Sequence, residues 1–175
     1  MDVIIETERL NLRQLCDEDW RLFHSLQSEP SVIALCFDKP SEFEIKKNFE
    51  SRLPQWNIDS EHWLCLMIID QKSQMKVGVT GFRLSEGVAE VGYLLLPEFH
   101  GQGYATESLE AVLGWGDQLG VISGFQAVVT QGNTASERVL QKCGFYLSKK
   151  VENAYEIGGK LFDDHVYVRA GNQTN

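Results

Sequence analysis

The fold of this chain is decided by residues 90–108, which read EVGYLLLPEFHGQGYATES. An apolar strand is predicted to end at Pro97, because proline cannot donate to a strand ladder. A Gly-x-Gly turn follows at Gly101 and Gly103, and a helix is expected over about residues 104–119. The first turn of a helix leaves about four N–H groups unpaired and carries partial positive charge. Strand, turn and helix together predict a phosphate or pyrophosphate site that needs no lysine, because the amides donate.

Alone, this turn is weak evidence, because a tight strand–helix connection without a ligand uses the same residues. Two other nucleotide-binding loops do not match on spacing. A dinucleotide-binding fingerprint requires a third glycine where this chain has Thr106, and it should follow the first strand of a βαβ unit. A P-loop requires Gly-Lys followed by Ser or Thr, which the segment lacks. A dehydrogenase-type nucleotide-binding protein nevertheless stays as one alternative function.

Outward from this segment, the sequence predicts one domain over residues 6–170, with 171–175 as a flexible tail. Three strands joined by short turns favour antiparallel pairing, and the strand that follows the helical crossover favours a parallel or splayed neighbour. S/T-x-x-E boxes predict helix starts at Ser41 and Thr134, Gly144 predicts a helix end, and Gly158-Gly159 predicts a hairpin. The order predicts an α+β fold around one central sheet. The predicted strands cover residues 8–15, 63–69, 76–84, 88–96, 125–130, 155–157 and 161–168.

The charge and composition of the chain limit the classes of partner that it can bind. The chain has 175 residues, with 16 Lys and Arg against 25 Asp and Glu, a formal net charge of −9. Such a surface repels nucleic acid and anionic lipid and favours a neutral or cationic partner, although the same charge also serves solubility alone. No apolar run approaches the roughly 20 residues of a membrane span, and a secretory signal is not expected. Four cysteines without CxxC spacing and four scattered histidines predict reduced thiols, a cytoplasmic location and no metal site.

Beyond single motifs, a series of segments in order resembles the GCN5-related N-acetyltransferase (GNAT) superfamily, in the branch of the ribosomal-protein N-terminal acetyltransferases. The resemblance covers roughly residues 6–169. The family pattern Arg/Gln-x-x-Gly-x-Gly/Ala falls on residues 100–105 and departs at its first position, which is His100. The resemblance implies a mixed, mostly antiparallel central sheet flanked by helices in three layers. The segments are TERLNLR (7–13), KVGVTGF (76–82), AEVGYLLLPEFHGQGYATESL (89–109), NTASERVLQKCGF (133–145) and GGKLFDDHVYV (158–168).

The resemblance also implies acetyl-CoA as the acetyl donor. The pantetheine arm is expected to pair like an extra strand with Leu94, Leu95 and Leu96, in a splay between that strand and residues 125–130. Asn133 is expected to hydrogen-bond near the pantetheine, and Ser136 to lie near the sulfur. Backbone amides are expected to hold the pyrophosphate. They belong to Gly101, Gln102, Gly103, Tyr104, Ala105 and Thr106.

Acetyl transfer to an amine needs a neutral amine, a proton acceptor and stabilisation of the thioester oxygen, for which we expect a strand amide near Leu94. Glu90 is the candidate base, because it is the one charged residue in an apolar strand, where burial favours the protonated carboxyl. A solvent-facing residue at the sheet edge is the alternative, and a water chain is another proton acceptor. Ser136 is the candidate acid for the leaving thiolate, or simply a favourable residue in the first helical turn.

The sequence thus predicts an enzyme that transfers an acetyl group to a primary amine by direct attack in a ternary complex. The acceptor is expected to be a cationic protein N-terminus or small molecule, and the protein a monomer or homodimer. Trp56, His62 and Trp63 either border the acceptor site or pack in the core. A non-catalytic CoA-binding sensor or scaffold with the same fold is the alternative, although the intact glycine turn, Asn133 and Ser136 argue against decay of the donor site.

Overall fold

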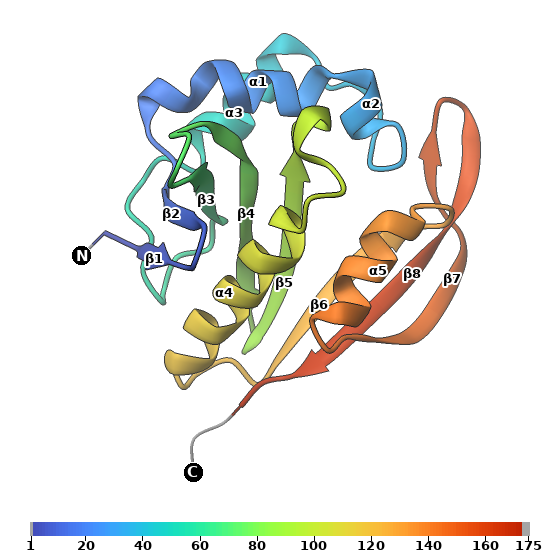
Figure 1. The fold of residues 1–175 in the computed structure, drawn as a ribbon. Coiled ribbons are helices and arrows are strands. Elements are labelled where there is room, and N and C mark those ends of the chain that lie inside the picture. Colours follow the sequence, from blue (N-terminus) through green and yellow to red (C-terminus); the bar gives the residue numbers. More distant parts are fainter. Residues whose placement is uncertain (1, 173–175) are drawn as a thin grey trace.

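One sheet of eight strands, in the order β1-β2-β3-β4-β5-β6-β8-β7, runs through the computed structural model, which describes residues 2–172 (Figure 1). Every neighbouring pair is antiparallel except β5 and β6, which are parallel. The predicted mixed, mostly antiparallel α+β sheet is confirmed. The strands are β1 (Ile4–Glu6), β2 (Leu10–Gln14), β3 (Leu64–Asp70), β4 (Lys76–Ser85), β5 (Val88–Leu95), β6 (Gly124–Thr130), β7 (Tyr146–Ile157) and β8 (Lys160–Ala170).

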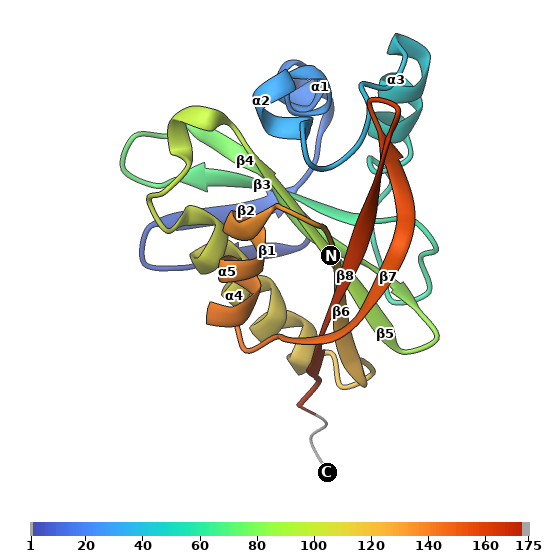
Figure 2. The ribbon, with the colours of Figure 1, turned by 90° about the vertical axis from the view of Figure 1, so that its right-hand side faces the viewer.

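Helices cover both faces of the sheet and give the expected three layers (Figure 2). One layer holds α1 (Trp20–Ser28), α2 (Pro30–Ile33) and α3 (Glu42–Glu50). The other holds α4 (Tyr104–Gln118) and α5 (Thr134–Lys142). Short 3-10 turns precede α1 and α4. No helix among residues 2–172 is both long and apolar enough to cross a membrane.

The sequence of strand β3 is almost continuously apolar because both of its faces are buried. Leu66 and Ile68 point into the core cluster formed with α4, whereas Cys65 and Met67 point into the cluster formed with α1 and α3. A strand buried on both faces has no polar side to alternate with. The central strands are therefore fixed by packing from both helical layers.

The N-terminal part differs from the prediction in one strand. The single strand predicted over residues 8–15 is shorter, and a separate strand, β1, pairs with it at the sheet edge. The helix start at Ser41 is confirmed. Its Oγ accepts a hydrogen bond from the Glu44 N–H at 3.2 Å, and the Glu44 carboxylate accepts one from the Ser41 N–H at 2.8 Å.

Asp19 joins the first helical layer to the sheet. Its fully buried carboxylate accepts hydrogen bonds from Arg13 at 2.7 and 3.0 Å and from Lys76 at 2.6 Å. Burial opposes ionisation of Asp19, but these bonds outweigh it and hold its pKa well below the ordinary range. The start of α1 is thereby fixed to β2 and β4.

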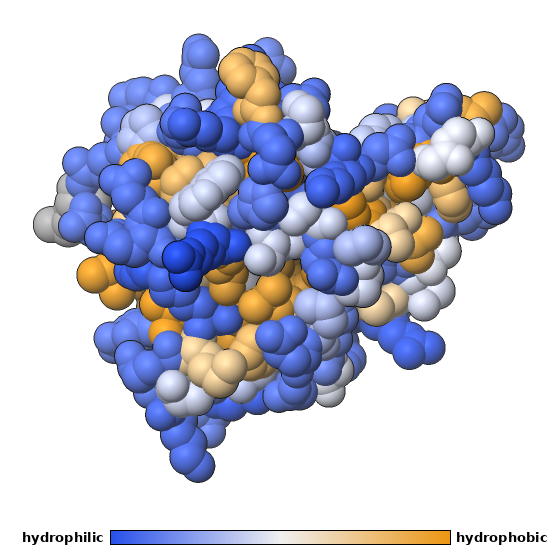
Figure 3. All heavy atoms as spheres, turned by 90° about the horizontal axis from the view of Figure 1, so that it is seen from above, coloured by the Kyte–Doolittle hydropathy of each residue, from blue (hydrophilic) through white to orange (hydrophobic). Residues whose placement is uncertain are grey.

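The C-terminal hairpin is longer than predicted. The two-residue turn is confirmed, with φ of 59° at Gly158 and 76° at Gly159. At the tip, the Gly158 N–H donates to Asp38 Oδ1 at 2.8 Å, so the hairpin contacts the first helical layer. Figure 3 shows hydrophobic patches in a mostly hydrophilic surface, one of them beside the projecting hairpin.

The end of β8 continues into residues that were expected in a flexible tail. The Gly171 N–H donates to Ser123 O at 3.0 Å, and the Asn172 N–H donates to Asp117 Oδ1 at 2.8 Å. These two residues are therefore held against the end of α4. The rest of the expected tail, residues 173–175, lies outside the described residues.

Candidate functional site

The turn before α4 presents a row of unused donors. Gly101 and Gly103 have φ of 72° and 81°, a left-handed conformation that glycine adopts without strain. Among residues 2–172, no backbone oxygen accepts from the N–H groups of residues 101–106. A Cβ built on Gly101 would meet no heavy atom within 4 Å, so the space in front of the turn is open. The arrangement fits a diphosphate, because backbone donors and the helix N-terminus both favour an anion.

Arg9 holds this turn in place. Its Nε lies 2.6 Å from Glu107 Oε2, and its Nη1 donates to Gln102 O at 3.0 Å. Its guanidinium also lies 4.6 Å from the centre of the Tyr104 ring. The turn is therefore preorganised from the start of β2. Sequence reasoning missed Arg9, although it belongs to one of the quoted segments.

Strands β5 and β6 separate beside that turn. They pair only where Val88–Glu90 meets Gly124–Gln126. Beyond this point β5 continues along β4 and β6 continues along β8, so the facing edges have no strand partner (Figure 1). The predicted splay is present, and its open edge can pair with an extended chain such as a pantetheine arm.

The hydrogen-bond pattern decides which residues of β5 face the gap. The Leu96 N–H donates to Val77 O at 3.0 Å, and backbone groups alternate in direction along an antiparallel strand. The backbone N–H and C=O groups of Leu94 therefore also point to β4, whereas those of Tyr93 and Leu95 point to the gap between β5 and β6. Of the three residues expected to pair with the pantetheine arm, Leu95 directs its backbone groups to the gap, whereas Leu94 and Leu96 direct theirs to β4. The strand amide next to Leu94 that points to the gap is that of Tyr93.

His100, which departs from the family pattern, contacts the same edge. Its Nε2 lies 2.9 Å from the carbonyl oxygen of Leu95. An imidazole N–H at this position donates to that carbonyl. The side chain thus connects the end of the open edge to the glycine turn.

Helix α5 begins one residue earlier than its predicted box. Asn133 is the N-cap, and its Oδ1 accepts from the Ser136 N–H at 3.3 Å. The box expected between Thr134 and Glu137 is wrong, because the Glu137 carboxylate instead contacts Nδ1 of His165 on β8. Asn133 and Ser136 therefore lie together in the first turn of α5.

Tyr93 connects this turn to β5. Its phenol donates to the carbonyl oxygen of Ser136 at 3.1 Å. Burial raises the pKa of Tyr93, which keeps the phenol neutral. The half-buried Ser136 is thereby brought beside the strand whose edge is open. No hydrogen bond involves its hydroxyl among residues 2–172.

Glu90 lies at the fork itself, but it is exposed. It pairs with Gln126 at the last position where β5 and β6 are joined, and with Arg83 on β4. The burial expected from its apolar neighbours is absent, because alternation along β5 turns Glu90 to the face opposite the buried Ala89 and Val91. By alternation its side chain lies on the same face of β5 as Gly92 and Leu94.

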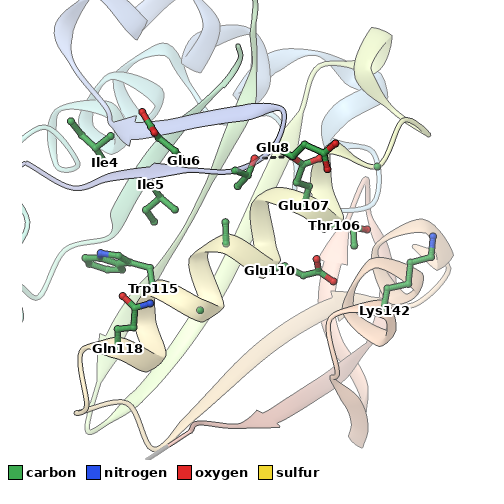
Figure 4. Close-up of a pocket in the computed structure, with 14 residues that line it drawn as sticks. Ile4, Ile5, Glu6, Glu8, Thr106, Glu107, Glu110, Trp115, Gln118 and Lys142 are labelled. Carbon is green, nitrogen blue, oxygen red and sulfur yellow. Dashed lines mark hydrogen bonds between the residues drawn. The ribbon is translucent and has the colours of Figure 1, made fainter. Parts of the chain in front are cut away.

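Another hollow borders the glycine turn. A groove of about 800 Å³ runs along α4 between β1 and α5 (Figure 4). Four carboxylates line it, those of Glu6, Glu8, Glu107 and Glu110, and it reaches the glycine turn only at Gly103 and Thr106. Negative charge disfavours a polyanion in this groove. The groove borders the turn on a side where carboxylates outnumber cations, with Lys142 as the one basic residue among the described residues of its lining.

A smaller pocket, of about 130 Å³, lies between the first helical layer and β5. Trp63 lines it, together with the stretch Gly92–Leu94. Trp56 instead packs in the core at 4% exposure, and His62 contacts Pro54 O. Two polar residues that sequence reasoning missed, Gln27 and Arg52, line the same pocket. Neither residue belongs to a sequence motif, so no local pattern pointed to them.

Within residues 2–172, no group of three or more His, Cys, Asp or Glu is arranged to hold a metal ion. The four cysteines are free.

A family profile described as "Acetyltransferase (GNAT) domain" matches residues 9–146. YoaA of Bacillus subtilis, an uncharacterized N-acetyltransferase, is 27% identical, covering 94% of both chains.

Solved structures agree in fold. The ribosomal L7/L12 α-N-protein acetyltransferase RimL, in complex with coenzyme A, superposes with a TM-score of 0.84 at 23% identity, covering 98% of this chain and 100% of that one. A spermidine N-acetyltransferase from Vibrio cholerae, in complex with CoA and spermine, superposes with a TM-score of 0.82 at 18% identity, covering 95% and 98%. The chain belongs to the GNAT family of acetyltransferases.

Proposed function

We propose that this chain transfers the acetyl group of acetyl-CoA to a primary amine, by direct attack in a ternary complex. The observation that carries the proposal is the open edge of β5, which leads to the unpaired N–H groups of residues 101–106. An edge that can pair with an extended arm and a row of donors that can hold a diphosphate match the two halves of coenzyme A.

The donor would be held mainly by the main chain. The N–H groups of residues 101–106 would bind the pyrophosphate, and the backbone groups of Tyr93 and Leu95 would pair with the pantetheine. Asn133 caps α5 beside this slot, and its amide N–H₂ remains available for a hydrogen bond. Bound acetyl-CoA supplies an activated acetyl thioester. The Tyr93 N–H would stabilise the charge that develops on the thioester oxygen.

Glu90 would take the proton of the attacking amine. Its exposure and its position on the same face as Gly92 support this role through a water molecule, because residues two apart on a strand are about 7 Å apart. A protein α-amine, with a pKa of about 8, loses its proton more readily than a lysine side chain. The amine needs to be neutral only at the moment of attack.

Ser136 would return a proton to the leaving thiolate. Its hydroxyl is not used by other described residues, and its carbonyl is held by Tyr93 on the strand that borders the slot. A hydroxyl in the first turn of a helix can also serve only as a favourable residue there. The two roles give different kinetics when the hydroxyl is removed.

The acceptor class is supported by charge and by analogy. RimL acts on a ribosomal protein N-terminus and the Vibrio cholerae neighbour on spermidine, and both substrates are amines. The net charge of −9 favours approach of a cationic amine. We place the reaction in the cytoplasm, where four free cysteines stay reduced.

The test is release of the coenzyme A thiol in the presence of acetyl-CoA and a panel of peptides and small amines, followed by mass analysis of the products. A mass increase of one acetyl group on an amine supports the proposal. Binding of coenzyme A without product from any amine would instead identify a sensor or scaffold.

A further inference from the structure

Arg52 carries a charge that no other described residue balances. Its guanidinium lies over the rings of Phe23, at 5.3 Å, and Trp63, at 5.7 Å. Its Nε is fully buried and has no hydrogen-bond partner. No carboxylate among residues 2–172 forms an ion pair with it. Arg52 is half-buried as a whole, but a buried N–H without a partner is costly, so a site that keeps one is suited to an anionic ligand.

Gln27 is a second unpaired polar group in the same pocket. It lies in the last turn of α1 and is only 5% exposed. Its carboxamide makes no hydrogen bond within the described part of the chain. A buried amide ordinarily has a partner. Arg52 and Gln27 thus both offer unused N–H donors to the same small cavity.

The rest of the pocket offers no compensating negative charge. Its walls are mostly apolar, from Phe37 and Trp63 to the strand residues around Val79. Burial raises the pKa of the Cys65 thiol to about 11, so this group stays neutral. The pocket is a locally positive site in a protein of net charge −9.

We propose that this pocket binds a carboxylate of the acceptor, so that the substrate is a primary amine with a carboxylate a few bonds away. The inference rests on the proposed acetyl transfer and names the class of its acceptor. A guanidinium fork matches a carboxylate in two parallel hydrogen bonds, and the Gln27 amide can donate a third.

Position and size support this class. The wall formed by Gly92–Leu94 belongs to the strand whose other groups face the open slot, so an acceptor anchored here has its amine beside the acetyl donor. A volume of about 130 Å³ is well below that of a drug-sized site and admits a carboxylate with a few carbons. The carboxylate can belong to a free amino acid or to an acidic residue at a peptide N-terminus.

The experiment compares matched acceptors. β-Alanine is compared with β-alaninamide, and the dipeptide Asp-Ala with Asn-Ala, by coenzyme A thiol release at varied acceptor concentration. We expect the wild type to have a lower KM for the acid than for its amide in the pair whose spacing fits the pocket. Arg52→Gln should raise KM for that member by about tenfold to a hundredfold, as expected for the loss of a charge-assisted hydrogen bond. KM for its amide and for acetyl-CoA should stay unchanged.

Arg21→Gln is the control, because Arg21 is an exposed arginine on α1 outside the pocket. Equal KM values for acid and amide in the wild type, or an equal loss for both in Arg52→Gln, would overturn the inference. If Arg52→Gln does not fold, Arg52→Lys and Gln27→Met provide the same comparison, with a smaller rise in KM for the acid alone.

A binding measurement separates this inference from the proposed reaction. Glutarate has two carboxylates and no amine, so it cannot be acetylated. A rise in the wild-type unfolding temperature with glutarate, lost in Arg52→Gln, supports the anion pocket even if no amine is acetylated. Acetylation of amines without acid preference, together with no glutarate effect, would refute the pocket and leave the transfer reaction standing.

Discussion

The phenol of Tyr93 donates a 3.1 Å hydrogen bond to the carbonyl oxygen of Ser136. The bond joins β5 to the first turn of α5 where β5 and β6 no longer pair. It therefore fixes the separation between the open strand edge and the helix turn that carries Asn133 and Ser136. Beyond the paired part of β5 and β6, a side-chain hydrogen bond therefore sets the width of the gap, and no backbone ladder closes it.

Tyr93→Phe keeps the ring and removes this bond. We expect the free energy of unfolding to fall by about 1 kcal/mol, the usual net value of one hydrogen bond. KM for acetyl-CoA should rise several-fold, because α5 is no longer tied to the strand. Urea unfolding and thiol-release kinetics measure the two effects. Tyr146→Phe, at a residue 64% exposed, is the control and should change neither.

The glycine turn predicts a second effect, on donor binding. Gly101→Ala puts a Cβ into the open space in front of the free amides and strains a residue at φ of 72°. We expect KM for acetyl-CoA to rise about tenfold or more, with a stability loss of about 1–2 kcal/mol.

Gly120→Ala is a matched control for that variant. Gly120 has φ of 71° and also has nothing within 4 Å of a built Cβ, but it follows the C-terminal end of α4. It should lose similar stability and keep its KM for acetyl-CoA. If both variants bind the donor equally well, the amides of the turn are not the pyrophosphate site.

Glu90→Gln tests the proposed base. We expect kcat to fall by about a hundredfold, within the usual range for general base catalysis, with little change in KM for acetyl-CoA. The dependence of kcat on pH should also weaken. Glu156→Gln, on the exposed strand β7, is the control. A Glu90→Gln enzyme with wild-type turnover across the pH range would assign the proton to a water chain.

Ser136→Ala tests the proposed acid. Asn133 still caps α5 through the backbone N–H of residue 136, so the fold should be kept. We expect a fall in kcat of about tenfold, with an unchanged KM for acetyl-CoA. A donor thioester with a better leaving thiol should reduce the deficit. Turnover equal to the wild type would mean that the hydroxyl only favours the helix start.

The strand–turn–helix around the site could be predicted because its signals are local. Pro97 ends a strand, Gly101 and Gly103 permit a left-handed turn, and a crossover helix implies a splayed neighbour. The direction of each amide on β5 could not, because it depends on the pairing of Leu96 with Val77 on another strand. A sequence pattern shows that a strand has an edge, but the register shows which residues face it.

Burial at the site depended on tertiary contacts in the same way. Glu90 is expected to be buried among apolar neighbours, yet it is exposed because it points to the face of β5 opposite the buried Ala89 and Val91. Gln27 and Arg52 are separated in sequence and meet only when α1 and the segment after α3 pack on β3 and β4. Neither residue belongs to a motif, so only the packed structure brings them into one pocket.

The last prediction concerns stability and pH. The buried Asp19 carboxylate is held by Arg13 and Lys76, so its pKa is lowered in the folded state. Its contribution is therefore present above the unfolded pKa of about 3.9 and is lost as the pH falls through the lower folded value. Stability should thus rise with pH below about 4. Asp19→Asn leaves the half-buried Arg13 and Lys76 without a carboxylate and should lower the free energy of unfolding by about 1.5–3 kcal/mol at pH 7, the usual value for hydrogen bonds to a charged group. Urea unfolding from pH 3 to 7 measures both effects, and Asp59→Asn, at an exposed loop position, should leave the pH profile unchanged. A wild-type profile without an acid-dependent loss, or an Asp19→Asn protein as stable as the wild type, would mean that this ion triad does not fix α1 to the sheet.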